Sequence, residues 1–117
     1  MVTLVLDWEK RFMRMQNHTG EHILTGVIHN KYGFDNVGFR LSDDDYVTLD
    51  LNGTLTYEEV IEMEKTANEV IYRNLAVKDS YPSKGELEMI DFRSKKEIDG
   101  QVRLISIGDE NETVLIR

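Results

Sequence analysis

Cysteine is missing from this chain, and proline, tryptophan and histidine are rare. The 117 residues contain no cysteine, one proline, one tryptophan and three histidines. Without cysteine the chain can form neither disulfides nor thiolate metal sites. No apolar stretch reaches the roughly 20 residues that a membrane-spanning helix needs, so we expect no membrane partner. Because the chain has no cysteine, any metal site must use imidazole and oxygen ligands.

Positive charge is also scarce. Lysine and arginine total 14 against 22 acidic residues, which gives a net charge of −8. Because nucleic-acid binding depends on cations that neutralise phosphates, this balance argues against strong autonomous binding. It leaves room for a local basic patch, and the visible cluster is Arg93-Ser94-Lys95-Lys96, followed by Arg103. A solvated charged stretch is the alternative interpretation of this cluster.

The bulk composition is that of a single globular domain. Hydrophobic residues make up 40% of the chain and charged residues 31%, which is ordinary for a folded protein. The length fits one domain, 1–117, with a core of moderate size. The apolar start Val2–Leu6 runs directly into Asp7 without a basic flank, so no secretion signal is predicted. We therefore expect a cytoplasmic location.

Caps and apolar periodicity predict an α+β fold, with mostly antiparallel strands and helices packed on one side. The first expected element is a strand at 2–6. A helix over 8–15 follows, capped by Asp7 and basic at Lys10, Arg11 and Arg14. The next helix is expected over 18–31, capped by Asn17 and ended by Gly33. Strands follow at 36–41 and 46–51. The later elements are a helix from the Thr56–Glu59 capping box to about Arg73, a strand at 77–81, a short helix from Ser83 to about Ile90, and strands at 102–107 and 113–116. The stripe expected to be buried on the longer of these two helices is Val60, Met63, Ala67, Val70 and Ile71.

The most informative motif is the run His18-Thr19-Gly20-Glu21-His22. Residues four apart on a helix lie on one face, one turn apart, so both imidazoles can reach a single metal ion. A helical wheel separates two groups, Ile23, Leu24, Val27 and Ile28 on one side and His18, His22, Thr25 and His29 on the other. Since the aliphatic side supplies the core, the histidines are not needed to fill it.

Three interpretations of this motif stay open. In the first, both histidines simply face solvent. In the second they bind zinc, although catalytic zinc sites usually have three protein ligands and one open position. His29 lies about two turns further along the helix, so we expect it at the surface and not as a third ligand. In the third, His18-x-x-Glu21-His22 is the pattern of inverted zinc proteases, with Glu21 as general base. A chain this short lacks the large scaffold of such enzymes.

Motifs along most of the chain carry a resemblance to a known family. They run in chain order: Asp7-Trp8-Glu9-Lys10-Arg11, the segment from Met15 to Leu24, Gly33-Phe34-Asp35-Asn36-Val37-Gly38-Phe39, Thr48-Leu49-Asp50, Leu55-Thr56, Glu64-x-x-Ala67-Asn68-x-x-Ile71, Phe92-Arg93-Ser94-Lys95-Lys96-Glu97 and Val102-Arg103. Together they resemble the editing domain of alanyl-tRNA synthetases and, more closely, the free-standing alanyl-tRNA editing proteins of the AlaX type. The resemblance extends from about Val2 to Ile107.

This resemblance implies an activity and a metal. Such proteins hydrolyse the ester bond of tRNA(Ala) wrongly charged with serine or glycine, a second sieve that is needed because small side chains differ little in binding energy. Zinc is held by H-x-x-x-H and a later C-x-x-x-H. By this resemblance His18 and His22 are the first two zinc ligands, Gln16 lies beside the pocket, and Gly38 lies on the strand that faces it.

The partners follow from the same resemblance. It implies tRNA(Ala) as the partner of the intact parent protein. The residues assigned to tRNA contact are Arg93, Lys95 and Lys96. An exposed sheet edge would in addition favour a homodimer.

Two parts of the family pattern are missing from this sequence. The Cys and the last His should follow the strand equivalent to 102–107, but 108–117 contains neither. The small glycine-rich β domain that usually precedes this domain is also missing. We therefore expect an incomplete fragment that binds zinc weakly or not at all and is inactive as it stands. The alternatives are a non-catalytic binding or scaffold module with the same fold and, more remotely, a zinc peptidase.

Overall fold

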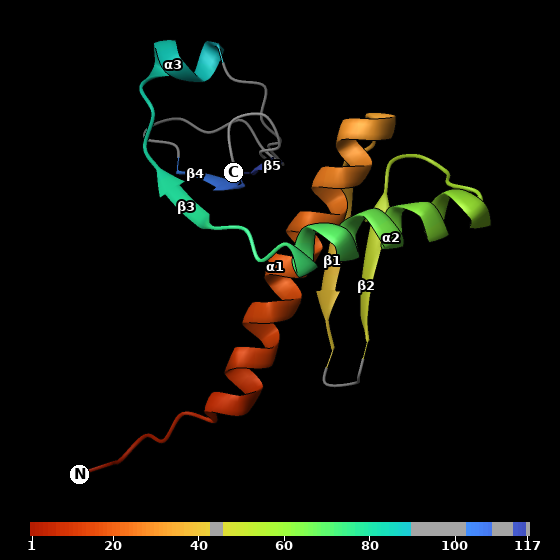
Figure 1. The fold of residues 1–117 in the computed structure, drawn as a ribbon. Helices are drawn as coiled ribbons and strands as arrows, with labels where there is room; N and C mark the ends of the chain where they lie inside the picture. The colour runs from red at the N-terminus through yellow and green to blue at the C-terminus, as the bar shows by residue number, and fades with distance from the viewer. Residues whose placement is uncertain (43–45, 90–102, 109–113, 117) are drawn as a thin grey trace.

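Helices and two small antiparallel sheets make up the fold, which is an α+β fold as predicted (Figure 1). The computed structural model describes residues 1–42, 46–89, 103–108 and 114–116. Its elements are α1 (Trp8–Tyr32), β1 (Asn36–Leu41), β2 (Val47–Leu51), α2 (Tyr57–Tyr72), β3 (Val77–Ser80), α3 (Lys84–Glu88), β4 (Leu104–Ile107) and β5 (Val114–Ile116). Strands β1 and β2 form one sheet, and the other has the order β3-β4-β5. Every pairing among these strands is antiparallel.

Helix α1 is one continuous helix of 25 residues, where the sequence predicted two. Asp7 caps its start, as predicted, by accepting a hydrogen bond from the Lys10 backbone N–H at 3.2 Å. It ends at Gly33, also as predicted, whose φ of 72° few other residues adopt. The predicted break at Asn17 is wrong. A cap-forming residue does not stop a helix that is already growing, because each further residue adds a hydrogen bond whereas a new start needs a costly nucleus.

The segment Val2–Leu6 does not form the predicted strand. Its side chains are strongly exposed, for example Val2 at 84% and Leu4 at 92%. Strand preference is expressed through packing against neighbouring strands, and none of the described strands pairs with this segment. The segment instead extends away from the rest of the chain, ahead of α1 (Figure 1).

The predicted capping box starts α2. The Glu59 backbone N–H donates to Thr56 Oγ1 at 3.3 Å, and the Thr56 N–H donates to Glu59 Oε1 at 3.3 Å. A second box, also predicted, starts α3, where the Glu86 N–H donates to Ser83 Oγ at 3.3 Å. Both helices therefore begin where local sequence signals place them.

Only part of the stripe predicted on α2 is buried. Met63 and Ala67 are 2% and 6% exposed, and Val70 is half-buried. Val60 and Ile71 are 47% and 48% exposed, so the prediction is wrong for these two. Among the described elements, α2 packs mainly against α1, which it crosses (Figure 1). A single neighbouring helix buries a narrower stripe of side chains than a whole sheet or several helices would.

The core lies where α1 meets α2 and the strands. Its buried residues form two clusters, Ile23, Ala67 and Ile107 in one and Val27, Ile28 and Met63 in the other. The aliphatic side predicted for α1 is thus its core side. The three-stranded sheet joins this core through β4, the central strand, whose Ile107 is 3% exposed and whose Ile105 packs against the first cluster. None of the helices within the described ranges combines the length and the apolar character of a membrane span.

Candidate metal centre

His18 and His22 lie together on one face of α1. Their Nε2 atoms are 3.1 Å apart and their ring centroids 4.6 Å apart. Two imidazole nitrogens bound tetrahedrally to one zinc ion, each at about 2.0–2.1 Å, lie roughly 3.3 Å apart. The His18 ring is exposed and the His22 side chain is 22% exposed. The pair therefore has a spacing and an accessibility that suit two ligands of one small cation.

Thr25 and His29 do not join this pair. Thr25 was predicted on the same polar face but is 1% exposed, and its Oγ1 donates to the Glu21 carbonyl oxygen at 2.8 Å. The shared side of the helix is therefore covered at Thr25, because a hydroxyl bonded to a carbonyl one turn back can be buried at little cost. His29 is partly exposed, at 29% of its side chain, and its Nδ1 lies 2.9 Å from Asp35 Oδ1.

Glu21 lies behind the pair and is buried. Its side chain is 1% exposed, and its Oε2 lies 3.2 Å from His22 Nδ1. One donor atom from each of Glu21, His18 and His22 lies within 4.8 Å of the others. The carboxylate thus approaches the His22 ring at Nδ1, whereas the two Nε2 atoms face each other. A general base for a metal-bound water would have to lie on the Nε2 side, so the geometry does not favour the peptidase interpretation of Glu21.

Asn36 is the residue of this site that the sequence did not reveal. Its Nδ2 donates to Glu21 Oε1, and its Oδ1 accepts a hydrogen bond from the Gly38 backbone N–H at 2.8 Å. Asn36 is 5% exposed and starts β1, where the pairing with β2 shifts register between Asn36 and Gly38. No sequence spacing signals a contact between Glu21 and Asn36, because β1 reaches the helix only after the chain reverses at Gly33.

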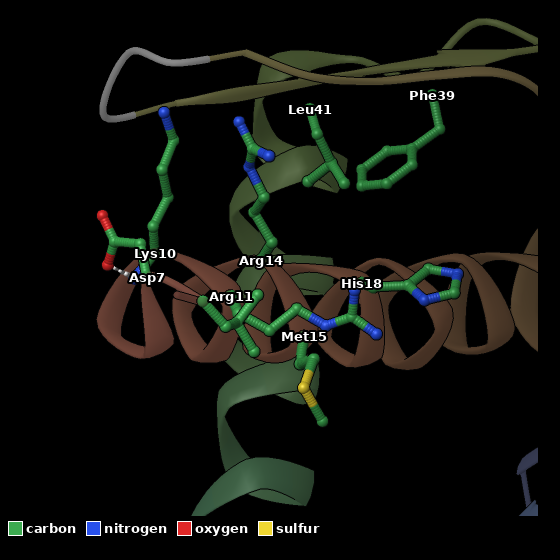
Figure 2. Close-up of a pocket in the computed structure, with 9 residues that line it drawn as sticks. Asp7, Lys10, Arg11, Arg14, Met15, His18, Phe39 and Leu41 are labelled. Atoms are coloured by element: carbon green, nitrogen blue, oxygen red, sulfur yellow. Dashed lines mark hydrogen bonds between the residues drawn. The ribbon is translucent and has the colours of Figure 1, made fainter. Parts of the chain in front are cut away.

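A cavity of about 540 Å³ opens beside His18 (Figure 2). Its lining consists of Leu6, Asp7, Lys10, Arg11, Arg14, Met15, His18, Phe39 and Leu41. The basic residues predicted on one side of α1 form one wall, and β1 contributes apolar side chains to the other. The Phe39 ring stacks on the His18 ring, with a centroid separation of 6.4 Å and an interplanar angle of 20°. This space combines cationic groups, apolar surface and one imidazole of the pair.

Gln16 and Gly38, the residues predicted to contact substrate, lie in different places. Gln16 lines a second cavity of about 480 Å³ and does not line the cavity beside His18. Two residues along a helix turn the side chain by about 200°, which accounts for this separation from His18. Gly38 lies in β1, where an added Cβ would be 2.6 Å from Asp50 Oδ2. Their substrate roles stay predictions.

The residues predicted to contact tRNA, Arg93, Lys95 and Lys96, lie outside the described residues. Arg103, which follows them in the sequence, is described. Its Nη2 and Nε atoms each lie 3.3 Å from Asp79 Oδ2. Arg103 is therefore paired with Asp79 of β3. The contact of Arg93, Lys95 and Lys96 with tRNA stays a prediction.

Comparison with known proteins adds independent information. No protein-family model matches the chain. The alanyl-tRNA editing protein AlaX-L of Pyrococcus horikoshii is 32% identical over 116 residues, which cover 96% of this chain and 28% of that protein. The alanyl-tRNA editing protein Aarsd1 of Bos taurus is 31% identical over 110 residues, covering 91% and 24%. The alanine–tRNA ligase of Thermococcus kodakarensis is 34% identical over 88 residues, covering 72% and 10%.

The fold and the site define an α+β domain with two histidines one turn apart on its first helix. Along nearly all of its length this domain is similar to one part of the alanyl-tRNA editing proteins, so the resemblance noted in the sequence is confirmed. The chain spans about a quarter of the length of AlaX-L and Aarsd1, with 28% and 24% of those proteins covered.

Proposed function

We propose that this chain provides the His-x-x-x-His half of a zinc site in a trans-editing deacylase, which hydrolyses tRNA(Ala) mischarged with serine or glycine. The observation that carries the proposal is the 3.1 Å separation of the His18 and His22 Nε2 atoms beside an accessible cavity. The similarity to alanyl-tRNA editing proteins supports the tRNA part of the proposal. A bound zinc ion would supply Lewis-acid chemistry at the ester.

The residues of this chain have distinct tasks in that proposal. His18 and His22 hold the metal, and Phe39 stacks on the His18 ring and restricts its orientation. Lys10, Arg11 and Arg14 line the cavity beside the pair and favour an anionic ligand, as expected for the end of a tRNA. Discrimination among small amino acids needs such a second site because one pocket separates them weakly.

Two imidazoles form only part of a catalytic zinc site. Such sites usually contain three protein ligands, and among the described residues the other candidate donor near the pair, Glu21, is turned toward His22 Nδ1. We therefore expect this chain alone to bind zinc weakly. Its deacylation of Ser-tRNA(Ala) or Gly-tRNA(Ala) should be undetectable, and robust turnover would contradict the incomplete site.

Zinc binding tests the ligand assignment directly. Calorimetric titration with Zn²⁺ should show weak binding to the chain and none to His18→Ala or His22→Ala. His29→Ala is the matched control, because His29 lies on the same helix and pairs with Asp35 instead; its binding should be unchanged. Equal binding by all three variants would rule out the pair as the metal site.

The deacylase itself is tested by completing the site. Extending the chain by a segment that carries the Cys-x-x-x-His of the family pattern should raise zinc affinity and produce hydrolysis of Ser- or Gly-tRNA(Ala). That activity should be lost in His18→Ala and retained in His29→Ala. A folded, zinc-loaded extension that hydrolyses neither substrate would overturn the proposal.

A binding module with the same fold is the second candidate. The observation in its favour is that β5 pairs in register with β4, with Ile105 opposite Ile116 and Ile107 opposite Val114, so this sheet forms without any metal ligand. Such a module would bind tRNA(Ala) equally well with and without zinc. A zinc-dependent affinity would favour the deacylase, and filter binding with and without a chelator separates the two.

We retain two further proposals from the sequence, a cytoplasmic location and a homodimer through an exposed sheet edge. In the three-stranded sheet the outer strands are β3 and β5, and outer strands offer backbone groups to a second chain. Sedimentation velocity should show a dimer whose population rises with concentration. A monomer throughout would contradict the dimer proposal without bearing on the zinc site.

A further inference from the structure

We propose that the first turns of α1 dock into an apolar groove beside α2 of a second copy of this chain. The docking segment is the α1 arm, residues 8–16, and the α2 groove lies between α1, β2 and α2. An amphipathic helix laid into an apolar groove is a recurring mode of recognition. The contact requires neither zinc nor tRNA, so it stands apart from the proposed deacylase.

The α1 arm carries an exposed apolar stripe. Trp8, Phe12 and Met15 are all exposed, and the Trp8 and Phe12 ring centroids lie 5.8 Å apart. Spacings of four and then three residues place these side chains on one side of the helix. The same spacing is typical of helices that anchor in a groove. Large apolar side chains gathered at the surface in this way mark an interaction site.

The α2 groove offers a matching apolar surface. Its volume is about 440 Å³, and aliphatic side chains from three elements line it, among them Leu24 of α1, Leu49 of β2 and Val60 of α2. Val60 and Ile71 were predicted to be buried, yet both are exposed at this groove. An apolar occupant would cover them, which accounts for an apolar stripe on α2 that is wider than α1 alone buries.

Opposite charge favours this pairing over the other combinations. The α1 arm contains three basic residues and one acidic residue, whereas α2 contains five glutamates and one lysine. Two arms, or two α2 helices, would therefore repel each other, while an arm and an α2 groove attract. The surface that complements the arm is thus present on a second copy of the same chain.

Arg11 and Glu64 place these charges beside the two apolar surfaces. Arg11 follows Trp8 by three residues, so it lies next to the apolar stripe of the arm. Figure 2 shows Lys10 and Arg14 extended toward the sheet of β1 and β2, whereas the Arg11 side chain is not. Glu64 is exposed and lines the α2 groove. The arrangement therefore pairs Arg11 of one copy with Glu64 of the other.

The α1 arm cannot occupy the groove of its own chain. Helix α1 is continuous over its 25 residues, so Trp8 and Leu24 are held about 24 Å apart along its axis at 1.5 Å per residue. Leu24 lines the α2 groove, and the arm projects beyond the point where α2 crosses α1 (Figure 1). Because the arm and the groove are different surfaces, the contact between two copies is heterologous.

Reversing one charge on each surface tests the contact. Arg11→Glu and Glu64→Arg should each weaken self-association by about 10-fold or more, because like charges then meet wherever an arm enters a groove. An equal mixture of the two variants should associate again. The arm of the first variant then meets the introduced arginine of the second, and the unchanged arm of the second meets the original Glu64. Sedimentation velocity in the presence of a chelator, without RNA, measures each variant alone and the mixture.

Glu69→Arg is the matched control. Glu69 lies on α2 but does not line the α2 groove, so the same change of charge should leave association unaltered. Phe12→Ala removes an anchor without changing the charge, and it should weaken association roughly 10-fold. Circular dichroism confirms that each variant is folded. The wild-type chain gives a test without any variant, since its association should weaken as salt screens the charges.

A wild-type chain that stays monomeric at every concentration, or whose association is insensitive to salt, would overturn the inference. Association that survives both charge reversals would also overturn it, because a contact through the edges of the sheets behaves in that way. The same holds for a mixture of the two variants that associates no better than either alone. None of these results bears on zinc binding, because His18 and His22 belong to neither the α1 arm nor the α2 groove.

Discussion

The two imidazoles of the pair are held by different neighbours. His22 has a buried carboxylate at Nδ1, whereas His18 is exposed and stacks on Phe39. An aromatic neighbour restricts the plane of a ring without choosing its tautomer, so His18 can adopt the tautomer that its surroundings require. A metal site at this position would thus combine one partly buried ligand with one exposed ligand.

Glycine at position 53 leaves space for an aromatic ring. An added Cβ would lie 2.4 Å from Phe34 Cδ1 and Cε1, and Phe34 packs against the core cluster that contains Met63. Because the ring cannot move without disturbing that cluster, Gly53→Ala should destabilise the fold by about 1–3 kcal/mol. Urea unfolding followed by circular dichroism measures the change.

Gly20→Ala is the control for this prediction. An added Cβ at this position in α1 meets no atom within 4 Å, so we expect a gain of roughly 0.5–1 kcal/mol from helix preference. A loss at Gly20 equal to that at Gly53 would show that steric overlap with Phe34 is not the cause.

The helices begin at local signals, and α2 offers the clearest test. Thr56 accepts from the Glu59 backbone N–H and donates its own N–H to the Glu59 carboxylate. Thr56→Ala should therefore cost about 1 kcal/mol in the free energy of unfolding. Thr66→Ala, on the same helix, is the control: its Oγ1 donates to the Glu62 carbonyl within the helix, and its loss should be near neutral.

The same capping box makes a pH-dependent contribution to stability. The hydrogen bonds with Thr56 lower the pKa of Glu59 below its ordinary value. Since the ionised form is favoured in the folded state, the contribution is complete above the ordinary pKa and is lost as the pH falls through the lowered folded value. Thr56→Ala should reduce this acid dependence in pH-resolved urea titrations. An unchanged dependence in the variant would point to another carboxylate.

At the scale of the whole molecule, stability depends on the narrow contact between α1 and α2. Met63 is 2% exposed in the cluster that joins these helices, so Met63→Ala should cost about 2–5 kcal/mol. Val60, three residues earlier, is 47% exposed, and Val60→Ala should change stability by less than about 1 kcal/mol. Thermal or urea unfolding compares them, and similar losses would mean that Val60 is covered in solution.

The proposed binding of tRNA should depend on a few basic residues of an otherwise acidic chain. The chain carries a net charge of −8, so binding must rely on local cations. Replacing Arg93, Lys95 and Lys96 by alanine should weaken tRNA(Ala) binding and flatten its salt dependence, because fewer counterions are released. Lys65→Ala/Lys78→Ala, outside the cluster, is the comparison. Equal weakening in both would indicate non-specific attraction.

The local features of the fold were predictable because short-range chemistry fixes them. Asp7, Gly33 and Thr56 mark helix ends through contacts within a few residues. The aliphatic side of α1 followed from periodicity alone. Two predictions failed because each depended on more than the local sequence. The break at Asn17 does not occur because the helix that starts after Asp7 continues through it, and residues 2–6 form no strand because no described strand pairs with them.

For the site, the sequence by itself determined that His18 and His22 share a helix face, since their spacing matches one helical turn. It also determined the resemblance to editing proteins. Only the tertiary structure placed Asn36 against Glu21, buried Thr25 and opened the cavity between α1 and β1. These features arise where segments distant in the chain meet. The hydrogen bond between Asn36 and the Glu21 carboxylate is formed at such a meeting, because Asn36 belongs to a strand that follows the helix.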